Sequence, residues 1–307
     1  TVQEGYDASA IKVTVDDVEL TPDSNGVYTL SDIKADKVIT ITGAEDTTAP
    51  TGTITIGTNT WKKFLNTITF DLFFKDTEKV TINANDEGSG VAEVYYHISD
   101  TSMTEEEVKA LSDWDLISNG DSFNLTPEEF AVVYAKLVDK AGNVGYISSN
   151  GMIFDYEAPV ITGINNGESY YEEKTVEITD KYLESVTIDG NTQALDSNNQ
   201  LTLKQTNKET VIVARDKAGN ETRVAVTVYK TYTVTLPEGE GYTIVAEEGS
   251  ASPVRYGESF SFTIKIAEGY TDEDIVVKAN AKVLTPLEGI YTINNITNDI
   301  AVTVDNV

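Results

Sequence analysis

The sequence lacks several residue types on which much protein chemistry depends. It contains no cysteine, one histidine and two methionines among 307 residues. The absence of cysteine excludes disulfides, thiolate nucleophiles and cysteine-ligated zinc or iron–sulfur centres. Because His97 is the only imidazole, a metal site built from several histidines is excluded too, and any histidine-based triad would have to use that residue.

Basic residues and long apolar runs are also scarce. Lys and Arg number 22 against 51 Asp and Glu, which gives a formal net charge of −29. A surface this anionic repels phosphate backbones, so we expect no nucleic-acid partner. No run of about 18 apolar residues occurs, and no membrane span is predicted. With 40% apolar and 24% charged residues, the chain has the composition of a globular protein.

One segment occurs twice, near each end of the sequence. The two copies align with a one-residue insertion near Asn25, and they share the motifs Gly5-Tyr6 and Gly269-Tyr270, Leu20-Thr21-Pro22 and Leu284-Thr285-Pro286, and Gly26-Val27-Tyr28-Thr29 and Gly289-Ile290-Tyr291-Thr292. Residues 232–267, which read as further strands, precede the second copy, but the first has no counterpart of them. We therefore expect residues 1–43 to be the back half of a module in a longer protein.

The expected half-module has physical consequences. The sequence predicts strands at Ile11–Val15, Val18–Leu20, Val27–Leu30 and Val38–Thr42. Without their front-half neighbours, these strands should leave an open sheet edge and an uncovered apolar face. We expect residues 1–47 either to mediate self-association or to be the least stable part of the chain.

A second repeat predicts two hairpins. Asp139-Lys140-Ala141-Gly142-Asn143 recurs as Asp216-Lys217-Ala218-Gly219-Asn220, each between runs of alternating apolar residues. The Asp side chain can start the turn by accepting backbone amides, while Gly takes the left-handed conformation. We assign Asp139, Gly142, Asn143, Asp216, Gly219 and Asn220 this structural role.

Two Ala-Pro dipeptides complete the division of the chain. They occur in Asp46-Thr47-Thr48-Ala49-Pro50 and Asp155-Tyr156-Glu157-Ala158-Pro159, and proline marks an edge strand or a linker because it cannot donate to a strand ladder. With the other repeats, they predict four units: a partial β-rich module (1–47), a sandwich with a helical insert (48–156), a small sandwich (157–230) and a complete β-rich module (231–307).

The pattern within these units is that of an all-β protein. Residues 157–230 contain predicted strands at Val160–Ile164, Thr175–Thr179, Leu183–Ile188, Gln200–Leu203, Glu209–Asp216 and Thr222–Tyr229, and six or seven short strands favour a two-sheet sandwich. In 48–156, Thr104-Glu105-Glu106-Glu107 is a capping box for a short helix through Leu111. Thr126-Pro127-Glu128-Glu129 predicts a second helical turn.

The Ala-Pro start paired with an Asp-Lys-Ala-Gly-Asn hairpin resembles the bacterial immunoglobulin-like modules of Gram-positive surface proteins. The stretches Trp61–Asn66 and Ile164–Gly167 resemble two varieties of these modules, and the terminal repeats resemble the short β-rich modules beside them. The resemblance implies tandem immunoglobulin-like β-sandwiches in an elongated, extracellular, wall-attached array. Exported Gram-positive proteins largely lack disulfides, so the absence of cysteine is compatible with this interpretation.

No catalytic residue is predicted. The 51 acidic residues single out no pair with the spacing in a cleft that a glycosidase needs. His97 lies in an alternating strand with no evident partner set. We expect the chain not to be an enzyme and to bind no cofactor.

A calcium site is the main alternative for the acidic loops. Asp86-Glu87-Gly88-Ser89-Gly90 offers two carboxylates, and Asp139 and Asp155 could approach from neighbouring loops. No Asp-x-Asp-x-Asp-Gly loop occurs, and such Asp residues commonly cap turns through hydrogen bonds to backbone amides. We therefore expect turn capping and no bound metal.

Aromatic residues offer a second candidate site. Phe70 and Phe74 lie in an alternating strand and are predicted to pack in a sandwich core, and Trp61 and Phe64 are expected to cover one end of the same sandwich. Trp114 instead lies between Asp113 and Asp115 in a segment that need not pack. These three are the candidate ligand contacts, because exposed aromatic faces stack on sugar rings.

Taken together, these features predict a non-enzymatic stalk or adhesive segment. The alternative is a carbohydrate-binding module, or an accessory region of a multi-domain extracellular enzyme that acts on glycans. The expected partner is a host or cell-wall glycan or protein.

Overall fold

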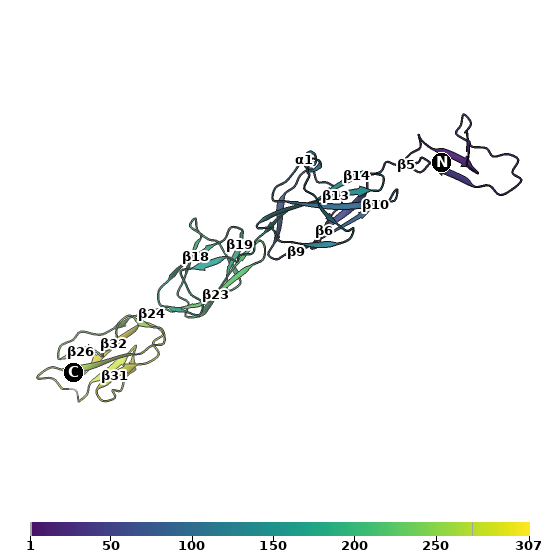
Figure 1. The fold of residues 1–307 in the computed structure, drawn as a ribbon. Helices are drawn as coiled ribbons and strands as arrows, with labels where there is room; N and C mark the ends of the chain where they lie inside the picture. Colours follow the sequence, from purple (N-terminus) through teal and green to yellow (C-terminus); the bar gives the residue numbers. More distant parts are fainter. Residues whose placement is uncertain (1, 272) are drawn as a thin grey trace. The chain divides into compact units, whose positions relative to one another are not determined.

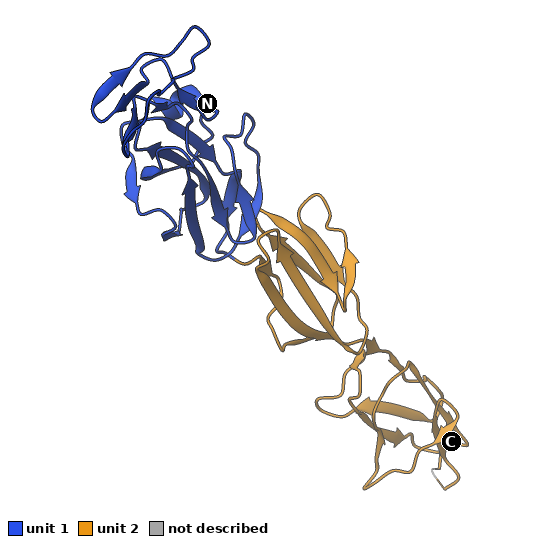
Figure 2. Ribbon diagram, turned by 90° about the vertical axis from the view of Figure 1, so that its right-hand side faces the viewer, with its two compact units in different colours: residues 1–157 blue, residues 158–307 orange. Residues whose placement is uncertain are grey.

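The computed structural model describes residues 2–271 and 273–307, and nearly all of its regular structure is β (Figure 1). The chain divides into two compact units, residues 1–157 and 158–307 (Figure 2). The expected all-β class is therefore confirmed. No helix in the described part of the chain is long and apolar enough to cross a membrane.

Unit 1 begins with a small sheet in the order β3-β2-β4 and with the pair β1–β5. The strands are β1 (Tyr6–Asp7), β2 (Lys12–Val15), β3 (Val18–Leu20), β4 (Ile39–Thr42) and β5 (Glu45–Asp46). Val13 and Val15 are buried, but their cross-strand neighbours on β4, Ile41 and Ile39, are 63% and 59% exposed. One apolar face of this sheet is thus only partly covered.

The strand predicted at Val27–Leu30 is wrong, because the structure assigns no strand there. The aligned segment near the C-terminus is β31 (Ile290–Ile293), which pairs with β28 (Phe260–Ile266). An extended segment becomes a strand only when a neighbour satisfies its backbone groups. Among the described residues, no strand pairs with residues 27–30.

The rest of unit 1 is a β-sandwich. One sheet has the order β12-β9-β6-β7, and the other has β11-β10-β13-β15-β8 with β14 paired to β13. The strands are β6 (Thr51–Ile56), β7 (Asn59–Trp61), β8 (Phe70–Phe74), β9 (Glu78–Asn85), β10 (Val91–Ser99), β11 (Asp115–Ile117), β12 (Ser122–Leu125), β13 (Phe130–Asp139), β14 (Val144–Ser148) and β15 (Gly151–Phe154). Apolar side chains from both sheets form its core, among them Ile54, Ile82, Val94, Leu137 and Phe154.

The helical insert covers the outer face of one sheet. Helix α1 (Glu105–Lys109) begins at the predicted capping box on Thr104. Its buried residue Val108 packs with Val132 and Tyr134 of β13, and the Tyr134 hydroxyl accepts a hydrogen bond from the Met103 amide at 2.7 Å. The insert is therefore a third layer on the sandwich.

The second predicted helical turn, at Thr126-Pro127-Glu128-Glu129, is wrong. Residues 126–129 form an irregular link from β12 to β13, and the Glu129 carbonyl accepts the Phe154 amide in the sheet. The hydrogen bond between Glu129 and Phe154 draws the end of this link into the sheet, and this pairing takes the place of a helical turn.

Unit 2 starts with a smaller sandwich. Its sheets have the orders β16-β18-β21 and β17-β23-β22-β19-β20. The strands are β16 (Val160–Thr162), β17 (Ser169–Tyr170), β18 (Lys174–Thr179), β19 (Leu183–Ile188), β20 (Asn191–Gln193), β21 (Gln200–Leu203), β22 (Glu209–Asp216) and β23 (Glu221–Val228). All six strands predicted here are present, and the two short edge strands β17 and β20 are additional.

The C-terminal part of unit 2 has a pair, β24–β27, and two sheets, β25-β32-β29-β30 and β26-β28-β31. The strands are β24 (Thr231–Tyr232), β25 (Val234–Thr235), β26 (Tyr242–Ala246), β27 (Val254–Arg255), β28, β29 (Val276–Ala279), β30 (Lys282–Val283), β31 and β32 (Ile300–Asp305). The two sheets enclose a core with Phe260, Phe262 and Tyr291. The short β25 runs parallel to β32, whereas the other pairs in this part are antiparallel.

Candidate functional site

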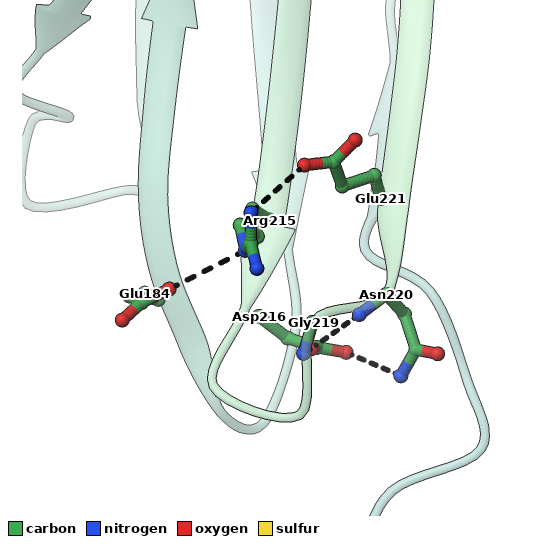
Figure 3. A network of polar contacts seen from close by, with 6 residues as sticks. All are labelled: Glu184, Arg215, Asp216, Gly219, Asn220 and Glu221. Atoms are coloured by element: carbon green, nitrogen blue, oxygen red, sulfur yellow. Dashed lines mark hydrogen bonds and ion pairs between the residues drawn. The ribbon is translucent and has the colours of Figure 1, made fainter. Parts of the chain in front are cut away.

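The two hairpins of identical sequence hold the most buried carboxylates among the described residues. Asp139 is 2% exposed and Asp216 is 0% exposed. In the second hairpin, Asp216 Oδ1 accepts the amides of Gly219 (2.6 Å) and Asn220 (2.8 Å), and its Oδ2 accepts Asn220 Nδ2 at 2.7 Å (Figure 3). The carboxylate therefore replaces water as the acceptor for the turn's donors.

The first hairpin repeats this geometry. Asp139 accepts the Asn143 amide and the Asn143 side-chain Nδ2, both at 2.8 Å. Gly142 and Gly219 both have φ of +92°, a left-handed conformation that an L side chain adopts only with strain. Arg215 beside the second hairpin pairs with Glu184 and Glu221 (Figure 3), but these side chains are half exposed and contribute little stability.

A group of three carboxylates lies where unit 1's sandwich begins. Asp46, Asp86 and Asp139 each place an oxygen within 4.8 Å of the others. Asp46 accepts the Thr48 amide (3.0 Å) and the Ser89 amide (2.7 Å). Hydrogen bonds from these two amides hold the pKa of Asp46 below its ordinary value, and the bond from Thr48 has the larger effect.

The acidic loop therefore caps turns as expected, but it has a different third partner. Asp86 accepts the Gly90 amide at 2.6 Å, and Asp139 approaches it as proposed, whereas Asp46 takes the place suggested for Asp155. Asp155 follows β15, and its Oδ1 accepts the Glu157 amide. The sequence contains a signal for Asp46, because Asp46 and Asp155 precede the two Ala-Pro dipeptides by the same spacing. This repeat makes Asp46 the equivalent of Asp155 in the first sandwich.

This group has the oxygen chemistry that a hard cation prefers. With one converging oxygen from each carboxylate, the group offers three ligands, fewer than the six to eight oxygens that calcium takes, so carbonyls and water would have to complete the shell. All three carboxylates already accept backbone amides. The absence of a bound metal therefore stays a prediction.

Trp114 was expected to lie in a segment that need not pack, but in the structure its side chain packs against the sheet. Its ring lies against the Val108–Tyr134 cluster, is half buried, and its indole N–H donates to the Leu111 carbonyl at 3.2 Å. The helical insert holds this ring against the sheet as part of the third layer. The expectation of a segment that need not pack was wrong.

The flanking acids are exposed, as a ligand-contact role requires. Asp113 lies beside His97, with 3.7 Å between its Oδ2 and His97 Nδ1. Asp115 begins β11, opposite Tyr96 of β10. Structure thus brings Asp113, Trp114 and His97 together and leaves Asp115 on the adjoining edge strand.

The remaining outer face of the sheet carries an aromatic patch, which we define as Tyr95, His97, Trp114, Lys136 and Tyr146. All five are half buried. Lys136 Nζ lies 5.2 Å from the Tyr95 ring centroid and 6.0 Å from that of Trp114, and Tyr146 lies 6.3 Å from Trp114. Such a surface offers ring faces and one cation, which suits stacking and hydrogen bonding to a polar ring.

Comparisons with known proteins give only distant likenesses. No family model matches the chain, and no curated protein matches it. Among solved structures, the fibronectin(III)-like modules of Clostridium thermocellum CbhA are 12% identical, with a TM-score of 0.28, over 58% of this chain and 94% of that one. A 1.5-MDa bacterial ice-binding adhesin is 12% identical, with a TM-score of 0.20, over 75% and 90%.

A third likeness is to the N-terminal eight Ig domains of Down Syndrome Cell Adhesion Molecule. It is 10% identical, with a TM-score of 0.21, over 99% of this chain and 44% of that one. Identities and TM-scores of this size do not identify a function.

The buried hairpin carboxylate can be tested by truncation. We expect Asp216→Ala to lower the free energy of unfolding of unit 2 by about 1–3 kcal/mol, because buried turn donors lose their acceptor. Asp196→Ala is the matched control, since that exposed Asp also accepts two turn amides, from Asn198 and Gln200. It should change stability by roughly 0.5 kcal/mol or less. Urea unfolding measures both, and equal effects would contradict a special role for burial.

Metal removal tests the acidic group. We expect EDTA, and then excess calcium, to leave the melting temperature nearly unchanged, because amide hydrogen bonds already satisfy Asp46, Asp86 and Asp139. Asp86→Asn should respond like the unaltered chain. A rise of several degrees with calcium that Asp86→Asn abolishes would instead show a structural cation bound to the native state.

Proposed function

We propose that this chain is a non-enzymatic structural segment of an extracellular bacterial surface protein, in which β-sandwich modules act as spacers. We further propose the division into modules 1–47, 48–156, 157–230 and 231–307. The observation that carries the proposal is the joint between the last two modules, inside unit 2. A spacer needs joints of limited flexibility. A free linker would let neighbouring modules reorient and would not keep the two ends of the chain apart.

Stacked tyrosines form this joint. Tyr229, at the end of the third module, stacks on Tyr171 with centroids 5.6 Å apart and on Tyr256 of the fourth module at 5.9 Å. The Arg255 guanidinium lies 4.2 Å from the Tyr171 ring centroid. Aromatic and cation–π contacts of this kind each contribute about 0.5–1.5 kcal/mol.

Hydrogen bonds to the backbone of Lys230 and from the Asn207 side chain fix the same joint. The Lys230 amide donates to Asn207 Oδ1 at 2.6 Å, and the Lys230 carbonyl accepts the Tyr256 amide at 3.0 Å. Asn207 Nδ2 donates in turn to the Tyr232 hydroxyl at 3.1 Å. The linking residues therefore have few free backbone torsions, which supports a stiff spacer.

The joint can be tested by distance measurements between spin labels. The chain has no native cysteine, so Thr192→Cys on β20 and Lys282→Cys on β30 give unique labels at exposed sites. We expect a narrow distance distribution that Tyr256→Ala broadens, because the stack is lost. Tyr270→Ala, which removes an exposed tyrosine outside the stack, should leave it unchanged. A broad distance distribution in the unaltered chain would contradict the spacer role. Small-angle scattering gives a second check, because a radius of gyration near the roughly 19 Å of a compact globule of this length would contradict it too.

The aromatic patch supports a second candidate function, a glycan-binding module. Its ring faces and Lys136 are accessible in part, and the exposed Asp113 lies at its edge. We expect Tyr95→Ala to remove any glycan-array signal, because this variant takes a stacking face and leaves the core intact. Tyr156→Ala, at an exposed tyrosine off the patch, is the control. If the unaltered chain gives no signal on the array, the glycan-binding role is excluded and the spacer role is the one that stands.

A further inference from the structure

The two terminal repeats have the same local structure. Asp16 and Asp17 have positive φ, as do the aligned Asn280 and Ala281. In each copy the first of these side chains accepts an aligned backbone amide. Asp16 accepts the amide of Val38, which directly precedes β4, at 3.1 Å, and Asn280 accepts the amide of Ala301 in β32 at 2.8 Å. The turn and the strand pairing are therefore equivalent in the two copies.

Their burial differs sharply. Ile33 is 60% exposed, and the aligned Ile296 is 2% exposed. Ile39 is 59% exposed, and the aligned Val302 is 4% exposed. Because the local fold is the same, the difference comes from what covers the face.

In the C-terminal copy, strand β28 covers this face. Strand β28 pairs with β31, which places Phe260 opposite Ile293 and Phe262 opposite Tyr291. The Phe262 ring stacks on Tyr291 with centroids 5.5 Å apart and planes 16° apart. Thus β28 supplies both the backbone partner and the aromatic contact.

The N-terminal copy has a hollow at the corresponding place. Tyr28, which aligns with Tyr291, lines a groove of about 640 Å³ together with Ile11, Val13 and Ile41. The aligned segment 27–30 has no regular secondary structure. A side chain equivalent to Phe262 and a strand equivalent to β28 would fill these two places.

We propose that residues 1–47 are an acceptor that binds one kind of occupant: a polypeptide segment with the chemistry of residues 231–268. Its central element is an extended strand with apolar residues at alternate positions, as in Phe260, Phe262 and Ile264 of β28. This strand adds alongside residues 27–30 by backbone hydrogen bonds, while its aromatic side chain stacks on Tyr28. The binding site is independent of the proposed spacer role.

The test uses the full chain with a labelled fragment of residues 231–268 as the probe. We expect saturable binding, together with new hydrogen-exchange protection at the amides of residues 27–30. A fragment with Phe260→Ser and Phe262→Ser is the control probe and should not bind. Fluorescence anisotropy gives the affinity, and exchange locates the site.

Two matched variants of the full chain locate the contact independently. Ile33→Asp should weaken binding by at least roughly tenfold, because it places a charge where the aligned residue is buried. Val283→Asp alters a residue of similar exposure, 58%, outside the proposed face and should change affinity by no more than about twofold. Both positions are exposed, so neither variant should unfold the chain.

Three outcomes would overturn the proposal. The first is no binding of the fragment. The second is binding that Ile33→Asp does not weaken or that protects β31 rather than residues 27–30, which would mean exchange with the C-terminal module's own strand. The third is a dimer in sedimentation that Ile33→Asp abolishes and the fragment does not disrupt, which would make a second copy the occupant.

Discussion

When apolar and polar side chains alternate along its strands, a β-sheet has one apolar face. The sheets of this chain depend on a second layer to cover that face. In the sandwich of unit 1, the covering layer is the opposite sheet, and the outer face of β13 is covered by α1 through Val108. In the C-terminal module, β28 covers the sheet that contains β29 and β32. Residues 1–47 repeat the sequence of that sheet, but no described strand covers its apolar face, and Ile33, Ile39 and Ile41 are exposed there.

Sequence patterns predicted the features that are local. The strands β19 and β22 have the predicted bounds because alternation and turn residues act over a few positions. The capping box on Thr104 is equally local. The hairpin aspartates accept the amides of their own turns, so the Asp-Lys-Ala-Gly-Asn motif alone contains the donors and the acceptor.

Features that depend on distant neighbours were not predictable in the same way. The position of Trp114 is set by Tyr134 and Val108, which belong to a different strand and a helix. Asp46 meets Ser89 across the start of the sandwich, and no spacing rule joins those two positions. The segment Val27–Leu30 was predicted as a strand because its side chains suit one. It lacks a neighbouring strand to satisfy its backbone, and residue types alone do not reveal whether such a neighbour is present.

The parallel pairing of β25 with β32 has a mechanical consequence. These strands lie near the first and last residues of the C-terminal module, with Val234 opposite Ile300 and Thr235 opposite Ala301. Tension applied through the two ends of the module pulls parallel neighbours in opposite directions along their length. The bonds between them are then loaded in shear and must break together, whereas an antiparallel hairpin pulled from its open end loses its bonds one after another. The direction of one short strand thus sets how this module bears a tensile force.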